Sequence, residues 1–263
     1  MTIAAPTAMD GGRQPDVSEQ EWRQRIRLAA AYRVVEHLGW TDTIYGHITL
    51  RVAGPGKHFL INPWGLRYDE VTASSLVKID LDGHPVGHAN YPVNRAGYVI
   101  HSAIHGARED VTCVFHTHTI AGMAVAEQRD GLLPVGMYAT GFHDRIAFHD
   151  YEGPSLRDAE RERLVAALGD KKILILRNHG LLTCGASLEE AFILMYRLER
   201  ACQVQIAAQA GGGPLTVPPR DVCEASAALT DEFLSGNDGL AVGQLEFDSF
   251  VRLIDRQDPS YKS

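Results

Sequence analysis

The sequence predicts an α/β or α+β fold in which helices cover the faces of a central sheet within one domain. The chain has 263 residues, of which 45% are hydrophobic, and this is enough for a full-sized core. Segments with apolar residues at helical spacing begin at capping residues, and short apolar runs typical of strands lie between them. Strand order is not predicted by this pattern.

The first elements follow an N-terminal stretch, residues 1–17, whose Ala, Pro, Gly and Asp content predicts a flexible arm. Ser18 and Glu21 form a capping-box pair, and apolar residues then recur at helical spacing until Gly39. This predicts an amphipathic helix. Strand-type runs separated by Gly- and Pro-containing turns follow over 47–52, 58–62 and 76–80.

The middle of the chain alternates between the two kinds of segment. We expect helices over 97–108 and 121–128, with an almost continuously apolar strand between them over 111–117. Ser155 and Asp158 predict the start of a further helix that ends near Leu168. Apolar residues over 172–176 and the shorter run 145–148 are typical of strands.

A second capping box, Ser187 with Glu190, predicts a long helix that ends near Ala210 before three consecutive glycines. Residues 18–213 are therefore interpreted as the domain. The Pro-rich stretch 214–219 begins a C-terminal extension, 214–263, with weaker helical patterns over 221–236 and 245–255. We expect this extension to pack on the same domain.

Charge and hydropathy exclude several classes of partner. The formal net charge of -8 and the scattered basic residues argue against nucleic acid and acidic membrane surfaces, because both are bound through clustered cations. Apolar runs stay shorter than the ~20 residues of a membrane span, so we expect a cytoplasmic protein. The four cysteines form no CxxC pair and are interpreted as buried apolar side chains.

Three histidines predict a metal site. His116 and His118 are two residues apart at the end of an apolar strand, so their side chains point to the same side. His179 follows a second apolar strand. If those two strands lie close in one sheet, three imidazoles converge as in sites that hold catalytic Zn²⁺ or Fe²⁺ with open positions. Imidazole ligands also accept Mn²⁺.

Several longer motifs resemble the class II aldolase and adducin head-domain family. They are the sequence around His116 and His118, Gly-Leu-Leu-Pro at 131–134, Arg-Asn-His-Gly at 177–180, Ser-Leu-Glu-Glu-Ala-Phe at 187–192, and the upstream segments 61–65 and 71–76. The resemblance covers about 19–211. It implies a single αβα sandwich around a mainly antiparallel sheet, assembled as a homotetramer with active sites between subunits.

The resemblance also implies a metal-dependent reaction. It assigns His116, His118 and His179 as ligands of Zn²⁺, which agrees with the spacing argument. Such a metal polarises a carbonyl oxygen, so that a neighbouring carbon–carbon bond breaks with its electrons held as an enolate.

Departures from the aldolase pattern argue against a sugar-phosphate substrate. The aldolases carry Pro-Ser-Ser-Glu, whereas this chain has Pro-Val-Asn-Arg-Ala-Gly at 92–97, which puts Gly97 at the position of the glutamate that moves protons. A Gly-Asn pair of the phosphate loop is replaced by Gly46 and His47. Arg95 is a candidate to bind a carboxylate instead.

The resemblance and the departures from it suggest candidate catalytic and binding residues. Tyr138 lies near the position of the catalytic tyrosine of aldolases, and His101 is a candidate base or support for the site. Five residues are interpreted as substrate-binding: His47, Asn62, Trp64, Asn94 and Arg95.

Three functions remain open from the sequence. The first is a metal-dependent lyase that acts on a small oxo or hydroxy acid by aldol-type cleavage or decarboxylation. The second is a non-heme Fe²⁺ oxygenase of the same fold, because three histidines without the glutamate leave sites for a 2-oxo acid and O₂. The third is a non-enzymatic interaction module like the adducin head.

Overall fold

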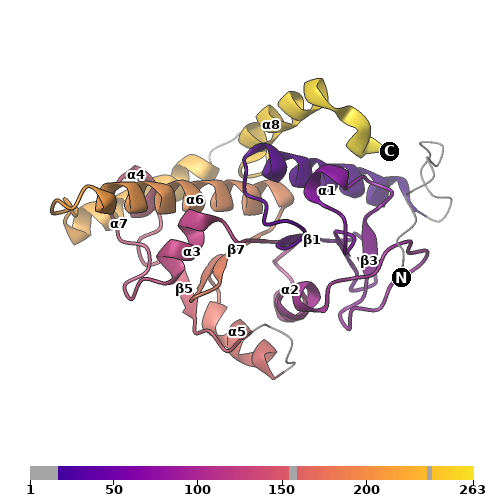
Figure 1. Cartoon of the computed structure of the whole chain (residues 1–263), viewed down its shortest axis with the longest axis horizontal. Coiled ribbons are helices and arrows are strands. Elements are labelled where there is room, and N and C mark those ends of the chain that lie inside the picture. Colours follow the sequence, from indigo (N-terminus) through magenta and orange to yellow (C-terminus); the bar gives the residue numbers. More distant parts are fainter. Residues whose placement is uncertain (1–16, 154–158, 236–238) are drawn as a thin grey trace.

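A seven-stranded sheet forms the centre of the computed structural model, which describes residues 17–153, 159–235 and 239–263 (Figure 1). Its strand order is β3-β2-β1-β4-β7-β6-β5, and every neighbouring pair is antiparallel except β5 and β6. The strands are β1 His47–Arg51, β2 Phe59–Ile61, β3 Val77–Ile79, β4 Cys113–Thr117, β5 Ile146–His149, β6 Ile173–Leu176 and β7 Gly180–Gly185. The predicted mixed fold with a mainly antiparallel sheet is confirmed.

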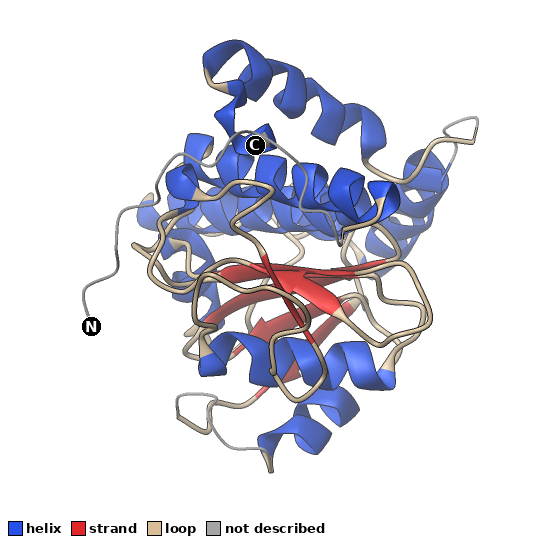
Figure 2. Ribbon diagram, turned by 90° about the vertical axis from the view of Figure 1, so that its right-hand side faces the viewer, coloured by secondary structure: helices blue, strands red, loops and turns tan. Residues whose placement is uncertain are grey.

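Helices cover both faces of the sheet (Figure 2). The α-helices are α1 Glu19–His37, α2 Arg95–Ala107, α3 Ile120–Ala126, α4 Met137–Thr140, α5 Glu160–Leu168, α6 Leu188–Ala210, α7 Arg220–Ser235 and α8 Gln244–Gln257. Helices α1, α6 and α8 contact one another on one face, while α2 and α5 pack together on the other. Within the described ranges, no helix is both long and apolar enough to cross a membrane.

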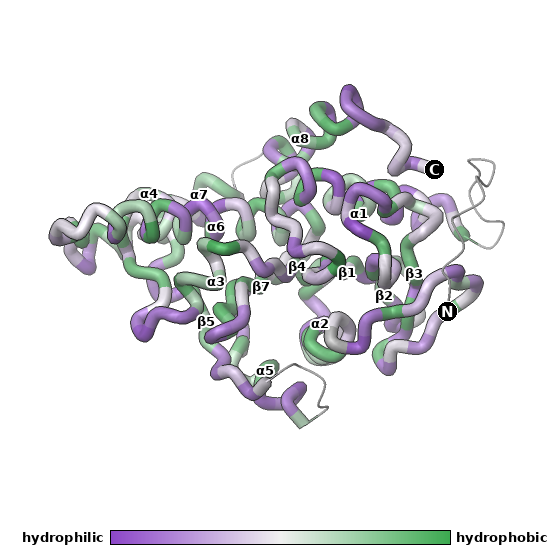
Figure 3. The backbone as a smooth tube through the Cα atoms, in the orientation of Figure 1, coloured by the Kyte–Doolittle hydropathy of each residue, from purple (hydrophilic) through white to green (hydrophobic). Residues whose placement is uncertain are grey.

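Alternation along the strands divides the core between these two layers. In β4, Cys113 and Phe115 belong to the cluster shared with α1 and α6, whereas Val114 belongs to the cluster shared with α2 and α5. Successive side chains of a strand point to opposite faces, so His116 points to the α2 face. Most residues of α2 are hydrophobic or neutral in Figure 3, as expected for a helix that packs against the sheet and against its neighbour α5.

Capping residues begin the two longest helices where the sequence predicts. The Ser18 side chain accepts a hydrogen bond from the Glu21 N–H, and the Ser187 side chain accepts one from the Glu190 N–H, both at 3.1 Å. In the C-terminal extension, Phe247 in α8 and Tyr261 in the 3-10 helix Pro259–Lys262 are fully buried in the same core cluster as α1.

Strand β7 is the main element that the sequence analysis missed. The strands before His116 and His179 lie in the same sheet but are not adjacent, because β7 lies between β4 and β6. Glycines at both ends of β7 weaken its strand pattern, and its identity depends on pairing with both neighbours. The predicted helix start at Ser155 and Asp158, and almost all of the predicted flexible arm, lie outside the described residues.

The buried hydroxyl of Tyr32 ties α1 to β1 and supplies a test of the fold. It accepts the Ile48 N–H at 2.8 Å and donates to the Ile48 carbonyl at 2.6 Å. We expect Tyr32→Phe to lower the free energy of unfolding by about 1–3 kcal/mol, because both backbone groups lose a buried partner. Urea unfolding measures this change.

The matched control is Tyr196→Phe, which removes a hydroxyl that accepts a hydrogen bond from the exposed Arg200. Its effect should stay within about 0.5 kcal/mol. Equal effects of the two substitutions would contradict the role given to Tyr32.

Candidate metal centre

Three histidine side chains meet at one end of the central strands. His116 lies in β4, His118 directly follows this strand, and His179 lies in the tight turn between β6 and β7. The Nε2 atom of His118 is 2.8 Å from Nε2 of His116 and 3.1 Å from Nε2 of His179. A Cβ atom at Gly180 would lie 2.5 Å from the Thr117 carbonyl oxygen, so glycine lets the turn approach this closely.

Hydrogen bonds hold two of these rings with Nε2 facing the centre. The Nδ1–H of His116 donates to the Leu181 carbonyl at 2.8 Å, and the Nδ1–H of His118 donates to the Asp42 carboxylate at 3.2 Å. The two Nε2 lone pairs therefore face each other, which is favourable when a cation lies between them. Metal-binding histidines are typically held in this way through their second nitrogen.

Burial keeps two of these imidazoles in the neutral form that binds metals. Together with the neighbouring imidazoles, burial lowers the pKa of His179 to about 4 and that of His116 well below its ordinary value. Neutral histidines are metal ligands, and three of them with open positions fit a divalent transition metal. The donor set therefore fits the expected cofactor.

A pocket of about 350 Å³ opens over the three histidines. Of the predicted substrate-binding residues, His47 and Asn94 line it. The pocket also has walls that the sequence analysis did not identify, namely Tyr45, Tyr151 and Asn178. Tyr45 and Tyr151 lie in loops outside the recognised motifs, so no local signal indicated them, whereas Asn178 belongs to the Arg-Asn-His-Gly motif and could have been identified from it.

The other predicted binding residues lie around this pocket rather than in its lining. Asn62 is buried, with its Oδ1 atom 3.1 Å from the Tyr32 hydroxyl, so it supports the junction of α1 and β1. Trp64 packs against Tyr45 with ring centroids 5.7 Å apart. Arg95 is exposed at the first position of α2, next to Asn94.

Tyr138 lies outside this pocket. It lines a groove between α4, α6 and α7, where Arg197 lies over its ring at 5.4 Å from the centroid. Within one chain the structure therefore does not bring Tyr138 together with the three histidines.

His101 is fully buried and does not line the pocket. Its Nδ1 atom and the Nε2 atom of His105 each lie 2.8 Å from the Thr49 hydroxyl. This hydroxyl has a single proton, so it donates to one ring and accepts from the other. The expected role of His101 as a base in contact with substrate does not fit this geometry, whereas a supporting role behind His47 does.

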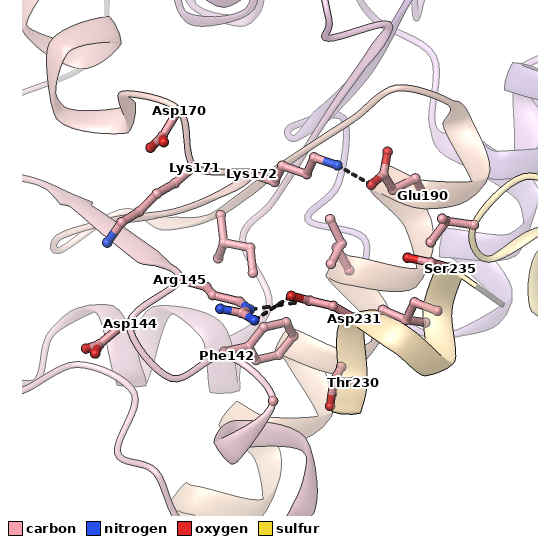
Figure 4. Close-up of a pocket in the computed structure, with 15 residues that line it drawn as sticks. Phe142, Asp144, Arg145, Asp170, Lys171, Lys172, Glu190, Thr230, Asp231 and Ser235 are labelled. Carbon is pink, nitrogen blue, oxygen red and sulfur yellow. Dashed lines mark hydrogen bonds and ion pairs between the residues drawn. The ribbon is translucent and has the colours of Figure 1, made fainter. Parts of the chain in front are cut away.

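A second hollow, of about 690 Å³, contains many charged side chains but no histidine (Figure 4). Its cations are already satisfied within the protein: Arg145 pairs with Asp231, Lys172 pairs with Glu190, and Lys171 donates to a backbone carbonyl. The pocket over the histidines, by contrast, combines space with three converging nitrogen donors for a metal.

Comparison with known proteins decides the family. A family model described as the class II aldolase and adducin N-terminal domain matches residues 26–206. A class 2 aldolase-type protein of Pseudomonas aeruginosa is 45% identical over 249 residues, which cover 95% of both chains. The chain belongs to the class II aldolase and adducin family. The resemblance found in the sequence is confirmed.

Both branches of the family appear among its relatives. Mouse α-adducin is 42% identical over 241 residues, which are 88% of this chain but 33% of that protein. The solved structure of an L-fuculose 1-phosphate aldolase from Glaciozyma antarctica has a TM-score of 0.79 and 30% identity, covering 95% of this chain and 97% of its own. Class II aldolases depend on a divalent metal, and the three-histidine group is a candidate site for one.

The structure shows what surrounds Gly97, the position at which the sequence comparison expects a glutamate in aldolases. The ring of His47 lies over Gly97, and a Cβ atom there would be 3.3–3.5 Å from three of the ring atoms. The same ring lies between His101 and His116, with centroid separations of 4.1 and 5.2 Å. His47 therefore occupies the space into which a side chain at position 97 would extend.

This close approach leaves little room for a side chain at position 97, because the contact of 3.3 Å with the His47 ring is tighter than an ordinary van der Waals contact. We expect Gly97→Ala to lower the free energy of unfolding by about 1–3 kcal/mol, because the added methyl group overpacks a buried ring. Gly106→Ala in the same helix is the control, since its Cβ atom would lie 3.7 Å from Leu81, an ordinary contact. That substitution should be neutral or stabilise by about 0.5–1 kcal/mol.

Replacing the His47 ring with a smaller side chain should relieve the overpacking that Gly97→Ala causes. Adding His47→Asn to Gly97→Ala should cost less than the sum of the single changes in a double-mutant cycle by denaturant unfolding. Strict additivity would show that the ring of His47 does not restrict position 97.

Burial of His105 predicts acid sensitivity. Burial, helped by the charge of Arg51, lowers the pKa of His105 from 6.5 to about 3. Between these pH values the unfolded chain binds a proton that the folded protein does not, so this contribution to stability is lost as pH falls from 6.5 toward 3. Urea unfolding at several pH values should show a smaller loss for His105→Gln than for the wild type, and parallel curves would contradict this assignment.

Proposed function

We propose that this protein is a divalent-metal-dependent lyase that acts on a small oxo or hydroxy acid by aldol-type cleavage or decarboxylation, with Zn²⁺ as its metal. The proposal depends on one observation: three imidazole Nε2 atoms converge while hydrogen bonds hold the Nδ1 protons of His116 and His118. The overall structural similarity of the protein to an L-fuculose 1-phosphate aldolase supports a lyase reaction.

Each residue around the pocket has a proposed task. His116, His118 and His179 hold the metal, and Asp42 fixes the orientation of His118. When bound, the cation acts as a Lewis acid toward the substrate carbonyl. Asn94 and Arg95 orient the acid group at the start of α2, while the neutral ring of His47 shapes the wall beside them.

Proton transfer is assigned to Tyr138 of a neighbouring subunit. Tyr138 does not reach the pocket of its own chain, so this role requires the active sites between subunits that the family resemblance implies. We therefore propose a homotetramer in the cytoplasm that acts on small molecules and binds no nucleic acid.

Metal analysis tests the proposal. Protein purified with and without air should contain about one Zn²⁺ per chain. His116→Ala should lose the metal and the lyase activity, whereas the exposed His88→Ala should retain both. Asp42→Asn should weaken metal binding by about 10- to 100-fold, because the carboxylate that orients His118 is lost.

Other results would point to the other functions. Iron that oxidises in air, with oxygen uptake dependent on a 2-oxo acid, would indicate an oxygenase. Absence of metal in the wild type would contradict the lyase. Such a result would favour the hypothesis of a non-enzymatic interaction module, which the similarity to α-adducin supports.

A further inference from the structure

Apolar and aromatic side chains form the walls of the pocket over the three histidines. Its lining includes Tyr45, Ile100, Met123 and Tyr151, which come from four separate segments of the chain. The three histidines lie at one end of the pocket, so this end is polar while the rest of the lining is largely apolar. Small-molecule sites commonly combine apolar walls with a few polar groups that set orientation.

Two aromatic rings stand at the pocket although they are half exposed. Tyr45 is 49% exposed and Tyr151 is 52% exposed. Tyr45 packs against Trp64, and Tyr151 makes an edge contact with His179 at 6.5 Å between centroids. Aromatic pairs prefer offset or edge-to-face geometry, and such exposed rings gain stability when a further apolar group covers them.

The pocket offers few polar partners to a substrate with many oxygen atoms. Among its described lining residues none is Lys or Arg, and apart from the histidines the polar side-chain groups are the amides of Asn94 and Asn178 and the hydroxyls of the two tyrosines. The Nε2 atom of His47 is buried, with no hydrogen-bond partner among the described residues. A phosphate or a polyol buried here would leave polar groups without partners, which is costly. An aromatic hydrocarbon ring has no polar atoms that need hydrogen-bond partners, so burying it here does not incur this cost.

The volume accommodates a ring together with an acid group. A cavity of roughly 150 Å³ lined by apolar side chains holds benzene. The pocket has about 350 Å³, which leaves room for a short hydroxy-acid chain that reaches the histidines.

We propose that the substrate is an aromatic hydroxy or oxo acid, whose oxygen atoms bind at the three-histidine end and whose ring packs between Tyr45 and Tyr151. This inference rests on the proposed metal-dependent function. It narrows the substrate class from small acids in general to acids with a ring on the carbon chain, and it excludes a phosphorylated sugar.

Calorimetric binding to the metal-loaded full chain tests the inference with three probes. Mandelate and lactate share the same 2-hydroxy-acid end and differ only in carrying a phenyl or a methyl group, while phosphoglycolate carries a phosphate. Mandelate should bind about ten-fold or more tightly than lactate, since even one methylene in an apolar pocket changes affinity by this order. Phosphoglycolate should bind more weakly than mandelate.

Variants at Tyr151 separate the ring from its hydroxyl. Tyr151→Ala should reduce the preference for mandelate over lactate to a few-fold, whereas Tyr151→Phe should keep it. If Tyr151→Phe behaves like Tyr151→Ala, the hydroxyl sets the preference and the inference is wrong.

The probes also distinguish failure of the inference from failure of the proposed function. Equal binding of mandelate and lactate that is lost in His116→Ala, or tighter binding of phosphoglycolate, would overturn the aromatic substrate and leave the metal site intact. If neither acid binds, or if both bind unchanged to His116→Ala, the proposed metal-dependent function fails and the inference fails with it.

Discussion

Antiparallel pairing of β4 with β1 and β7 is the constraint on which the site depends. Pairing with β1 puts His47 directly opposite His116, and pairing with β7 carries the turn that holds His179 to the same end of the sheet. A slip of one residue in either pairing would turn the inward side chains to the opposite face. The backbone ladder thus holds the imidazoles together before any metal binds.

The α2 face of the sheet is unusual because it buries polar rings. His47, His101 and His105 are almost inaccessible to solvent, and burial lowers the pKa of each. The Thr49 hydroxyl satisfies one nitrogen of His101 and one of His105, while Nε2 of His47 and of His101 has no partner. Buried polar atoms without partners reduce the stability of the folded protein. The same rings pack behind the candidate metal ligands and form a wall of the site.

The opposite face supplies the stability that the polar layer lacks. Its core cluster joins α1, α6 and α8 to the sheet, with fully buried Tyr32, Phe115, Phe192 and Phe247. Large aromatic side chains contribute most of the apolar area buried in such a core. One sheet therefore carries the larger hydrophobic cluster on one face and, on the other, a smaller cluster beside the buried histidine rings that shape the pocket.

Local spacing in the sequence determined the two longest helices, the His116–His118 pair and the family motifs, because capping bonds and side-chain periodicity act over a few residues. It also indicated His179 as a candidate ligand, since this residue follows a recognisable strand. Only the tertiary structure decided the place of β7, the bond from Asp42 to His118 across 76 residues, and the position of the His47 ring over Gly97. The aromatic walls and the position of Tyr138 outside the pocket belong to the same group. These features depend on contacts between distant segments, and such contacts leave no periodic signal in the chain.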